Sequence, residues 1–363
     1  MDRLRRLELF SAEAYAKWHH EVLDGADPYE HAFRFGMFGE CRIFDEVELA
    51  RQLARPQQAP GGVSLSLPPA VQSGSPSAAV YVSTRGNLFM REIAGDLVRD
   101  LNSAGMTAEL RDETSSIADR PPISIFMAPH EFFILGDGWD WVRDEVLQSA
   151  IMFGTEQPQT GWFAKSLPFL LMAAGAIDLC DQTVDLLRGI SVPAFHLVPG
   201  VAPYNPPLGE NDRQHPLFRV LPAAARMPPR ADTAFADRPI DIAFFGAASL
   251  RRQKFFAQHA ARLADYQNVI YLRSVEKGPL MESGGDGALT RLASHVAGHA
   301  KITLNIHQSA LGYFEWHRIV RQGMAAGSLV VSDTCLSHGD FKPGVHYLEA
   351  GLRQIPNLVD WLL

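Results

Sequence analysis

Cysteine is scarce in this chain: only Cys41, Cys180 and Cys335 occur among 363 residues, and they stand far apart. This spacing excludes a disulfide framework and a cysteine-based zinc site, and it is typical of reduced thiols in a cytoplasmic protein. Long hydrophobic runs are also missing. The longest, around residues 167–176, is too short to span a bilayer and is predicted to form a buried helix. The N-terminus lacks the apolar core and cleavage site of a signal peptide, so we expect a cytoplasmic protein.

Several catalytic motifs are absent as well. There is no GxSxG of a hydrolase, no GxxxxGK[ST] of a P-loop enzyme, and no DxD in a plausible metal loop. The adjacent His19 and His20 have no partners at metal-ligand spacing, so no metal cofactor is expected. The net charge of −8 argues against a general nucleic-acid or membrane-surface binder, although it permits a local basic pocket.

The length suggests two domains, and the pattern of strands and helices agrees. Residues 1–55 are predicted to form a helical extension, and residues 56–77, rich in Pro, Gly, Ser and Gln, a linker. Strand and helix patterns then alternate over residues 78–215 and 238–363, with a Pro-rich stretch between them. Such alternation predicts an α/β fold with two Rossmann-like domains, and ligands would bind in the cleft between them.

The most informative segment is 301–333, which reads as strand, loop, helix and strand. Residues 314–326 have apolar positions at helical spacing, and Gly327 stands where a helix favours positive φ at its end. The predicted helix would carry Glu315, His317 and Arg318 in its first turn, at the carboxyl edge of the sheet. A solvated helix start is the simpler alternative for any one of these residues.

A second cluster follows the predicted strand at residues 240–246. Gly246 would let a phosphate approach the backbone, and the following helix start carries Arg251, Arg252 and Lys254. Arginine can bind phosphate bidentately, although surface cations on a helix would give the same pattern. His307 lies just past a later strand end, beside Gln308, and we expect at least one of the two to face a ligand.

The first domain offers candidates for proton transfer. His130 and Glu131 leave a buried strand together, and a histidine there could accept a proton from a hydroxyl group. Glu156 lies in a loop shortly before Trp162, whose ring could stack on a sugar or another planar group. Ordinary turns would explain each of these residues equally well. Arg85 and Asn87 are two further candidates, and the tight turn that the fold needs would explain them equally well.

The run QGMAAGSLVVSD at residues 322–333 resembles the EAMACG-PVV-like run of GT-B glycosyltransferases, in particular the "glycosyl transferases group 1" (CgeB-like) branch. The resemblance covers mainly residues 240–350. It departs from the family at the second of two glutamates, where this chain has Gln322, and Glu315 matches the first only if the register shifts by one residue.

The resemblance implies a cytoplasmic enzyme that moves a sugar from a nucleotide diphosphate sugar to an acceptor hydroxyl. The implied catalytic residues are His130, Glu315 and His317. The implied donor-binding residues are Gly246, Arg252, Lys254, His307, Gln308, Tyr313, Arg318 and Gln322. The implied acceptor-binding residues are Arg85, Asn87, Glu131, Glu156 and Trp162.

Two other functions fit the same pattern. An epimerase-type enzyme with two Rossmann-like domains would bind the same donor without an acceptor, and product analysis would distinguish it. A non-catalytic nucleotide-sugar-binding protein is the other alternative, favoured by the amide at Gln322. The sequence leaves open the sugar, the nucleotide, the acceptor, the stereochemistry of transfer and the oligomeric state.

Overall fold

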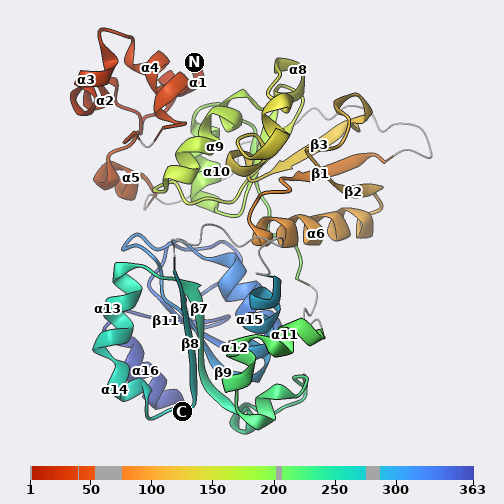
Figure 1. Ribbon diagram of the computed structural model, residues 1–363. Coiled ribbons are helices and arrows are strands. Elements are labelled where there is room, and N and C mark those ends of the chain that lie inside the picture. Colours follow the sequence, from red (N-terminus) through yellow and green to blue (C-terminus); the bar gives the residue numbers. More distant parts are fainter. Residues whose placement is uncertain (1, 40, 54–75, 202–206, 275–286) are drawn as a thin grey trace. The chain divides into compact units, whose positions relative to one another are not determined.

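The computed structural model describes residues 2–39, 41–53, 76–201, 207–274 and 287–363 (Figure 1). The chain forms two compact units, Met1–Gly200 and Val201–Leu363, and each contains its own parallel β-sheet. This confirms the predicted α/β class with two Rossmann-like sheets. The predicted linker at residues 56–77 lies outside the described residues except for its last two positions.

The first unit has a six-stranded sheet in the order β2-β1-β3-β4-β5-β6, all of it parallel. Its four inner strands, β1, β3, β4 and β5, are short, mostly buried runs, as expected for a parallel sheet with helices on both faces, whereas the edge strands β2 and β6 are more exposed. The strands are β1 (Ala78–Val82), β2 (Ala108–Asp112), β3 (Ile123–Met127), β4 (Ile151–Gly154), β5 (Gly175–Asp178) and β6 (Ala194–His196).

Short helices precede this sheet, as the sequence predicted for an N-terminal extension; they are α1 (Asp2–Arg6), α2 (Ala12–Trp18), α3 (His20–Leu23), α4 (Pro28–His31), the π-helix η1 (Ala32–Gly36) and α5 (Glu46–Leu53). The helices among the strands are α6 (Leu88–Ser103), η2 (Ile117–Asp119), α7 (Pro129–Phe132), η3 (Gly136–Trp141), α8 (Asp144–Leu147), α9 (Gly161–Met172) and α10 (Asp181–Gly189).

The second unit has a five-stranded parallel sheet in the order β11-β10-β9-β7-β8. Its strands are β7 (Ile240–Ala247), β8 (Asn268–Arg273), β9 (Ala300–Asn305), β10 (Leu329–Asp333) and β11 (Leu348–Ala350). Its helices are α11 (Glu210–Gln214), α12 (Pro216–Val220), η4 (Ala223–Arg226), η5 (Phe235–Asp237), α13 (Leu250–Gln258), α14 (Ala260–Leu263), α15 (Gly287–His299), η8 (His317–Gly323), η9 (Met324–Ala326) and α16 (Ile355–Leu362).

Alternate residues of β7 face opposite sides of this sheet, as the two-residue period of a strand requires. Ile242 and Phe244 pack in one core cluster, which contains side chains of α13 and α16. Ala243 packs in the other core cluster, which contains side chains of α12 and α15. Helices therefore cover both faces of this sheet, and the strand ends are where a ligand is expected.

One predicted helix differs from the expected geometry. The segment predicted as an ordinary helix over residues 314–326 is a π-helix, His317–Gly323, followed by a short 3-10 turn. Glu315 therefore precedes the helix, and its carbonyl accepts hydrogen bonds from the amides of Arg318 and Ile319. Gly327 has a φ of 73°, which confirms its predicted role at the helix end. Single π turns are frequent at functional sites.

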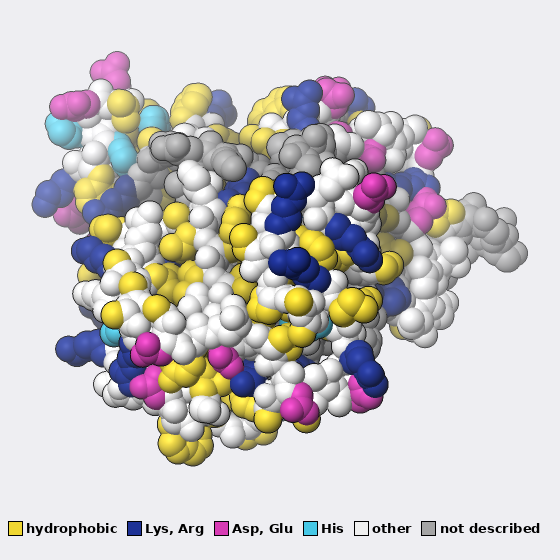
Figure 2. Space-filling view, turned by 60° about the horizontal axis from the view of Figure 1, so that its bottom comes forward, with side chains coloured by type: hydrophobic (Ala, Val, Ile, Leu, Met, Phe, Trp, Pro, Cys, Tyr) yellow, Lys and Arg dark blue, Asp and Glu magenta, His cyan; other side chains and the backbone are white. Residues whose placement is uncertain are grey.

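On the face shown in Figure 2, basic and acidic side chains are scattered among hydrophobic and uncharged ones. Charges of both signs share this face, in keeping with 33 basic and 41 acidic residues in the chain. No helix among the described residues is long and apolar enough to cross a membrane.

Candidate functional site

In the second unit, the order of the strands reverses between β7 and β9. β8 lies on one side of β7, whereas β9, β10 and β11 are added successively on the other side. Where the order reverses in a parallel sheet, the connecting helices go to opposite faces and leave a crevice at the carboxyl ends of the strands. The residues that follow β7 and β9 are therefore the first candidates for ligand binding.

Arg252 joins these two strand ends. It lies in the first turn of α13, and its side chain is 0% exposed. Its Nε donates to the carbonyl of Ile306 at 2.7 Å, and its Nη1 donates to the carbonyl of Ala247 at 3.0 Å. Its Nη2 has no hydrogen-bond partner and lies 3.5 Å from the carboxylate of Glu315. Two of the three guanidinium nitrogens thus hold the backbone, and Nη2 remains for an anion.

Arg318 lies against Gly246 at the end of β7. Its guanidinium donates to the carbonyl of Phe245, and its Nε lies 3.0 Å from Oε2 of Glu315. A Cβ atom at position 246 would lie 2.7 Å from Nη1 of Arg318 and 2.8 Å from the ring of Phe244. Glycine at 246 is therefore needed for the close approach of the guanidinium, as well as for any approach of a phosphate.

His307, just past β9, is hydrogen-bonded to Asp333 at the end of β10. The Asp333 carboxylate accepts from the His307 amide at 2.9 Å and from its Nδ1. Nε2 of His307 lies 2.7 Å from the carbonyl of Tyr313, closer than the 3.4 Å to Nδ2 of Asn305, so Nε2 also carries a proton. Burial lowers the pKa of His307, but the hydrogen bond to Asp333 and the nearby Glu315 outweigh it and the pKa is raised.

The resulting cluster has an excess of positive charge. Arg251 completes it: its Nη1 lies 2.5 Å from Oδ2 of Asp333 and donates to the carbonyl of His307. Three arginines and the protonated His307 thus face only two carboxylates, Glu315 and Asp333. Burial, and then the neighbouring Arg318, lowers the pKa of Arg252 to about 9. An anionic ligand would relieve this excess.

The structure brings together Gly246, Arg252, His307, Glu315 and Arg318 among the candidate residues. The other candidates of this unit lie around them with different exposure. Lys254 and Gln308 are exposed, Tyr313 is buried, and His317 and Gln322 are half-buried. Asp333 is not among the residues predicted from the sequence, although it ends an apolar strand, and His307 was predicted from its place just past such a strand.

The order of the strands reverses in the first unit too, between β1 and β3. Here a carboxylate joins the two strand ends: Oε2 of Glu131 accepts from the amide of Asn87 at 2.8 Å. Glu131 is carried by α7, which begins after Ala128, a non-glycine residue with a φ of 48°. Strained backbone of this kind is concentrated at functional sites. A second carboxylate, Glu113, accepts from the amide of Thr84 at 2.8 Å.

His130 is buried beside two carboxyl groups. Its Nδ1 lies 2.9 Å from Oγ of Ser166, and its Nε2 lies 3.6 Å from Glu156 and 4.0 Å from Glu131. Burial lowers the pKa of His130 to about 3 and raises the pKa of Glu131 to about 7. Burial and the charge of Glu131 likewise raise the pKa of Glu156 to about 7. At neutral pH the carboxyl groups, rather than the imidazole, are poised to exchange a proton.

Trp162 presents an exposed ring next to this group. The indole is 52% exposed, lies 5.8 Å from the ring of His130, and has Nζ of Lys165 at 4.5 Å from its centroid. Stacking of this kind suits the apolar face of a sugar or an aromatic ring. Arg85 is also exposed, in the turn after β1.

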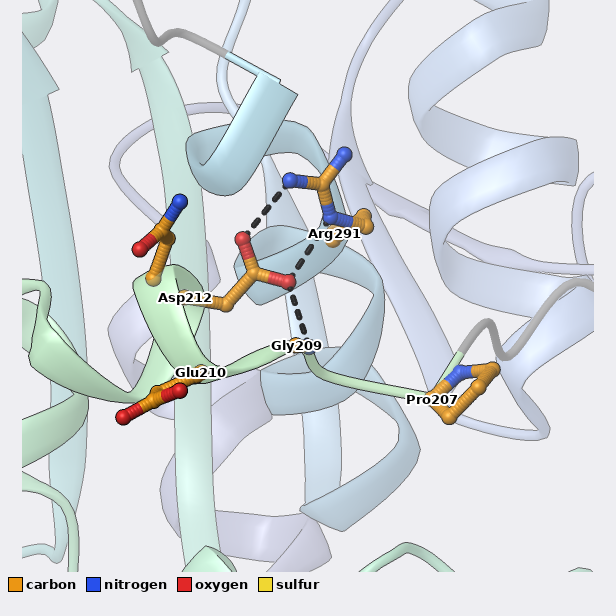
Figure 3. Close-up of a pocket in the computed structure, with 6 residues that line it drawn as sticks. Pro207, Gly209, Glu210, Asp212 and Arg291 are labelled. Atoms are coloured by element: carbon orange, nitrogen blue, oxygen red, sulfur yellow. Dashed lines mark hydrogen bonds and ion pairs between the residues drawn. The ribbon is translucent and has the colours of Figure 1, made fainter.

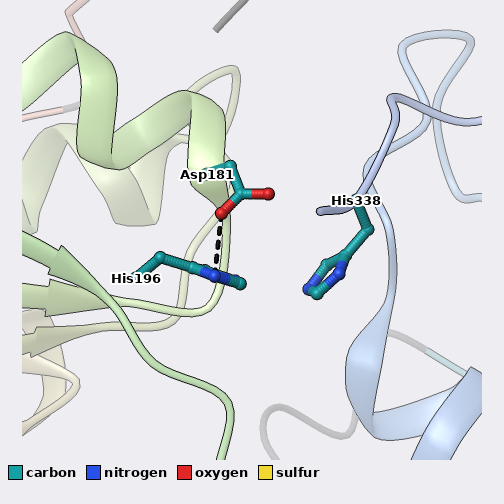
Figure 4. Close-up of side chains that lie close together, drawn as sticks. All are labelled: Asp181, His196 and His338. Atoms are coloured by element: carbon teal, nitrogen blue, oxygen red, sulfur yellow. Dashed lines mark ion pairs between the residues drawn. The ribbon is translucent and has the colours of Figure 1, made fainter. Parts of the chain in front are cut away.

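Further acidic groups follow the next strands of the first unit. Asp178 ends β5; it is 2% exposed, accepts from the amide of Cys180 at 2.8 Å, and its Oδ2 has no hydrogen-bond partner. Burial raises the pKa of Asp178 well above its usual range. Asp181 lies 2.8 Å from Nδ1 of His196 (Figure 4). None of these three side chains is among the residues predicted from the sequence, although Asp178 ends an apolar strand.

A separate depression of about 420 Å³ lies in the second unit (Figure 3). Its lining residues are Pro207, Gly209, Glu210, Asn211, Asp212 and Arg291. Arg291 binds both carboxylate oxygens of Asp212 at 2.7 and 2.8 Å, and Asp212 also accepts from the amide of Gly209. The polar groups there satisfy one another and tie α11 to α15, so we assign the depression a structural role. None of the candidate residues lines it.

Comparison with known proteins gives likenesses of fold only. No family model matches the sequence, and no curated protein matches it. A crystal structure of Anabaena Alr3699/HepE in complex with UDP is similar with a TM-score of 0.42 at 9% identity, over 78% of this chain and 89% of that one. A glycosyltransferase from Rickettsia africae ESF-5 gives a TM-score of 0.42 at 8% identity, over 79% and 88%.

An α1,3-fucosyltransferase with GDP-fucose gives a TM-score of 0.39 at 11% identity, over 86% of this chain and 82% of that one. All three TM-scores are below 0.5, so none of these proteins assigns a function to the chain. The α/β class with two parallel sheets stands on the topology itself.

Proposed function

We propose that this protein is a glycosyltransferase of the GT-B type, which transfers a sugar from a nucleotide diphosphate sugar to an acceptor hydroxyl. The observation that carries the proposal is the cationic cluster at the strand reversal of the second unit. The cluster contains buried and half-buried arginines next to a glycine, and the carboxylates around the arginines neutralise only part of their charge. A diphosphate group could bind to such a site, because arginines bind phosphate through paired hydrogen bonds.

In this proposal the second unit binds the donor. Arg318 and Nη2 of Arg252 contact the diphosphate, and Arg251 and His307 add positive charge while holding the loop that follows β9. As the bond from the sugar to the diphosphate breaks, negative charge grows on the leaving oxygens. Fixed cations in a buried site stabilise that charge, so arginines do here what a metal ion does in other transferases.

The first unit binds the acceptor in this proposal. The acceptor lies on Trp162, and its hydroxyl faces His130 and Glu156. When the hydroxyl oxygen attacks the sugar, its proton passes to the Glu156 carboxylate. His130 stays neutral and holds the acceptor through Nε2, because its Nδ1 is engaged with Ser166.

A thermal-shift screen of the full chain against nucleotide sugars tests the donor part. A ligand at one hundred times its Kd should stabilise the fold by about 2.7 kcal/mol, which gives a clear rise in melting temperature. Mass spectrometry of mixtures with candidate acceptors then distinguishes transfer from epimerisation. If no nucleotide sugar raises the melting temperature, the proposal is wrong.

A further inference from the structure

Glu315 occupies the place where an anionic ligand would meet the arginines. Its Oε1 lies 3.5 Å from Nη2 of Arg252, and its Oε2 lies 3.0 Å from Nε of Arg318. The Glu315 side chain is 14% exposed, so solvent screens these pairs little. One carboxylate thus faces both guanidinium groups at the strand reversal.

The two contacts are loosely made, however. Nη2 of Arg252 and Oε2 of Glu315 are buried and neither has a hydrogen-bond partner, although each lies within ion-pair distance of an opposite charge. A buried guanidinium nitrogen without a hydrogen bond is unfavourable, and a better-placed acceptor would gain by engaging it. The other two nitrogens of Arg252 are fixed on backbone carbonyls, so the group cannot turn away.

We propose that Glu315 is an internal stand-in for the diphosphate: its carboxylate pairs with Arg252 and Arg318, and the diphosphate must displace it to bind. This inference rests on the proposed donor site and deepens it. The displaced carboxylate becomes available for the hydroxyl groups of the bound nucleotide sugar. Glu315 then serves two successive purposes, which explains an acidic side chain in a site for an anion.

The charges around Glu315 support an exchange rather than a permanent pair. Asp333 is paired with Arg251 and His307, and no hydrogen bond or ion pair joins it to Arg252 or Arg318 among the described residues, although its charge reaches Arg252 at longer range. When Glu315 leaves, the two arginines present an unneutralised pair of charges to the incoming diphosphate. A ligand with two negative phosphate groups matches that pair, whereas a monoanion replaces Glu315 without gain.

Calorimetric titration with inorganic pyrophosphate tests the inference, because this probe has no base or sugar. In Glu315→Gln the competing charge is gone, so we expect pyrophosphate to bind about tenfold more tightly than in the wild type, a change of about 1.4 kcal/mol. Glu349→Gln is the control: it makes the same charge change on a half-buried residue that contacts Cys335 and Tyr347 instead. It should leave the affinity unchanged.

Glu315→Asp keeps the charge but shortens its reach, and it should give an affinity between the two. Melting temperatures of all variants establish that they are folded. Unchanged or weaker pyrophosphate binding by a folded Glu315→Gln overturns the inference and leaves the donor site standing, because a merely structural Glu315 would give that result. If neither the wild type nor Glu315→Gln binds pyrophosphate, the donor site is overturned as well.

Discussion

The strand order reverses once in each of the two sheets, but the side chains that lie at the two reversals carry opposite charge. In the first unit, the carboxylates of Glu131 and Glu113 accept from backbone amides beside the strand reversal. In the second unit, the guanidinium groups of Arg252 and Arg318 donate to backbone carbonyls there. Fold alone therefore does not set the polarity of such a crevice; the residues placed on it do.

Under the proposed function, this contrast would divide the work of a transferase between the two units. Buried carboxyl groups whose pKa lies near 7 suit the removal of a proton from a neutral acceptor. Buried arginines suit an anionic leaving group. Substitutions at one strand reversal that leave the other intact test this division between the two units.

The largest effect is expected from Arg252→Ala. The change leaves the carbonyls of Ile306 and Ala247 without their donor and Glu315 without one of its cations, in a fully buried place. We expect a loss of about 3–5 kcal/mol in the free energy of unfolding, measured with urea. Arg230→Ala removes an exposed arginine paired with Asp232 and should change little. Equal stability of the two variants would show that Arg252 does not hold the strand ends.

The next effect is a pH dependence in the first unit. The folded pKa of Glu156 is raised to about 7 from an ordinary 4.5, so the folded state holds a proton that the unfolded state has lost. The contribution of Glu156 to the free energy of unfolding is therefore fully present below pH 4.5, and it is lost as the pH rises to 7 and above. Glu156→Gln removes this loss, and at pH 8 it should be more stable than the wild type by roughly 3 kcal/mol, at about 1.4 kcal/mol per pKa unit.

Unfolding free energies of both proteins at pH 4.5 and pH 8 provide the measurement. The advantage of the amide should shrink on acidification. An advantage that is the same at both pH values would mean that Glu156 is ionised in the fold, and the proton-accepting role would lose its basis.

A smaller effect is expected from Gly246→Ala in the second unit. The added Cβ would meet Nη1 of Arg318 at 2.7 Å and the ring of Phe244 at 2.8 Å. The guanidinium must shift, and we expect pyrophosphate to bind about tenfold more weakly, or about 1.4 kcal/mol. Gly161→Ala is the matched control, because nothing lies within 4 Å of its Cβ position. Equal affinity in both variants would remove Arg318 from the anion site.

The features that depend on the local order of residues could mostly be predicted from the sequence. Short apolar runs became parallel strands, and Gly327 took the positive φ expected at a helix end. The sequence also predicted that Gly246, His307 and Glu315 lie at one edge of the sheet, because parallel strands have their carboxyl ends on the same side.

Other features depend on pairings that sequence spacing does not encode. Arg252 is completely buried because its guanidinium crosses to Ile306, 54 residues further along the chain. The pKa of His307 is raised partly because Asp333, from another strand, meets its Nδ1. The π-helical form of His317–Gly323 also lies beyond what apolar spacing distinguishes, and it moved Glu315 out of the helix.

The central claim is that the anionic donor binds at the arginine cluster on the strand reversal of the second unit, and not at the strand reversal of the first unit. Calorimetric titration with UDP tests it most directly, with one cation removed from each unit. Arg318→Ala should bind UDP at least tenfold more weakly than the wild type. Lys165→Ala, which removes the cation beside Trp162, should bind it as tightly as the wild type. Loss of binding in Lys165→Ala with full binding in Arg318→Ala would contradict the account.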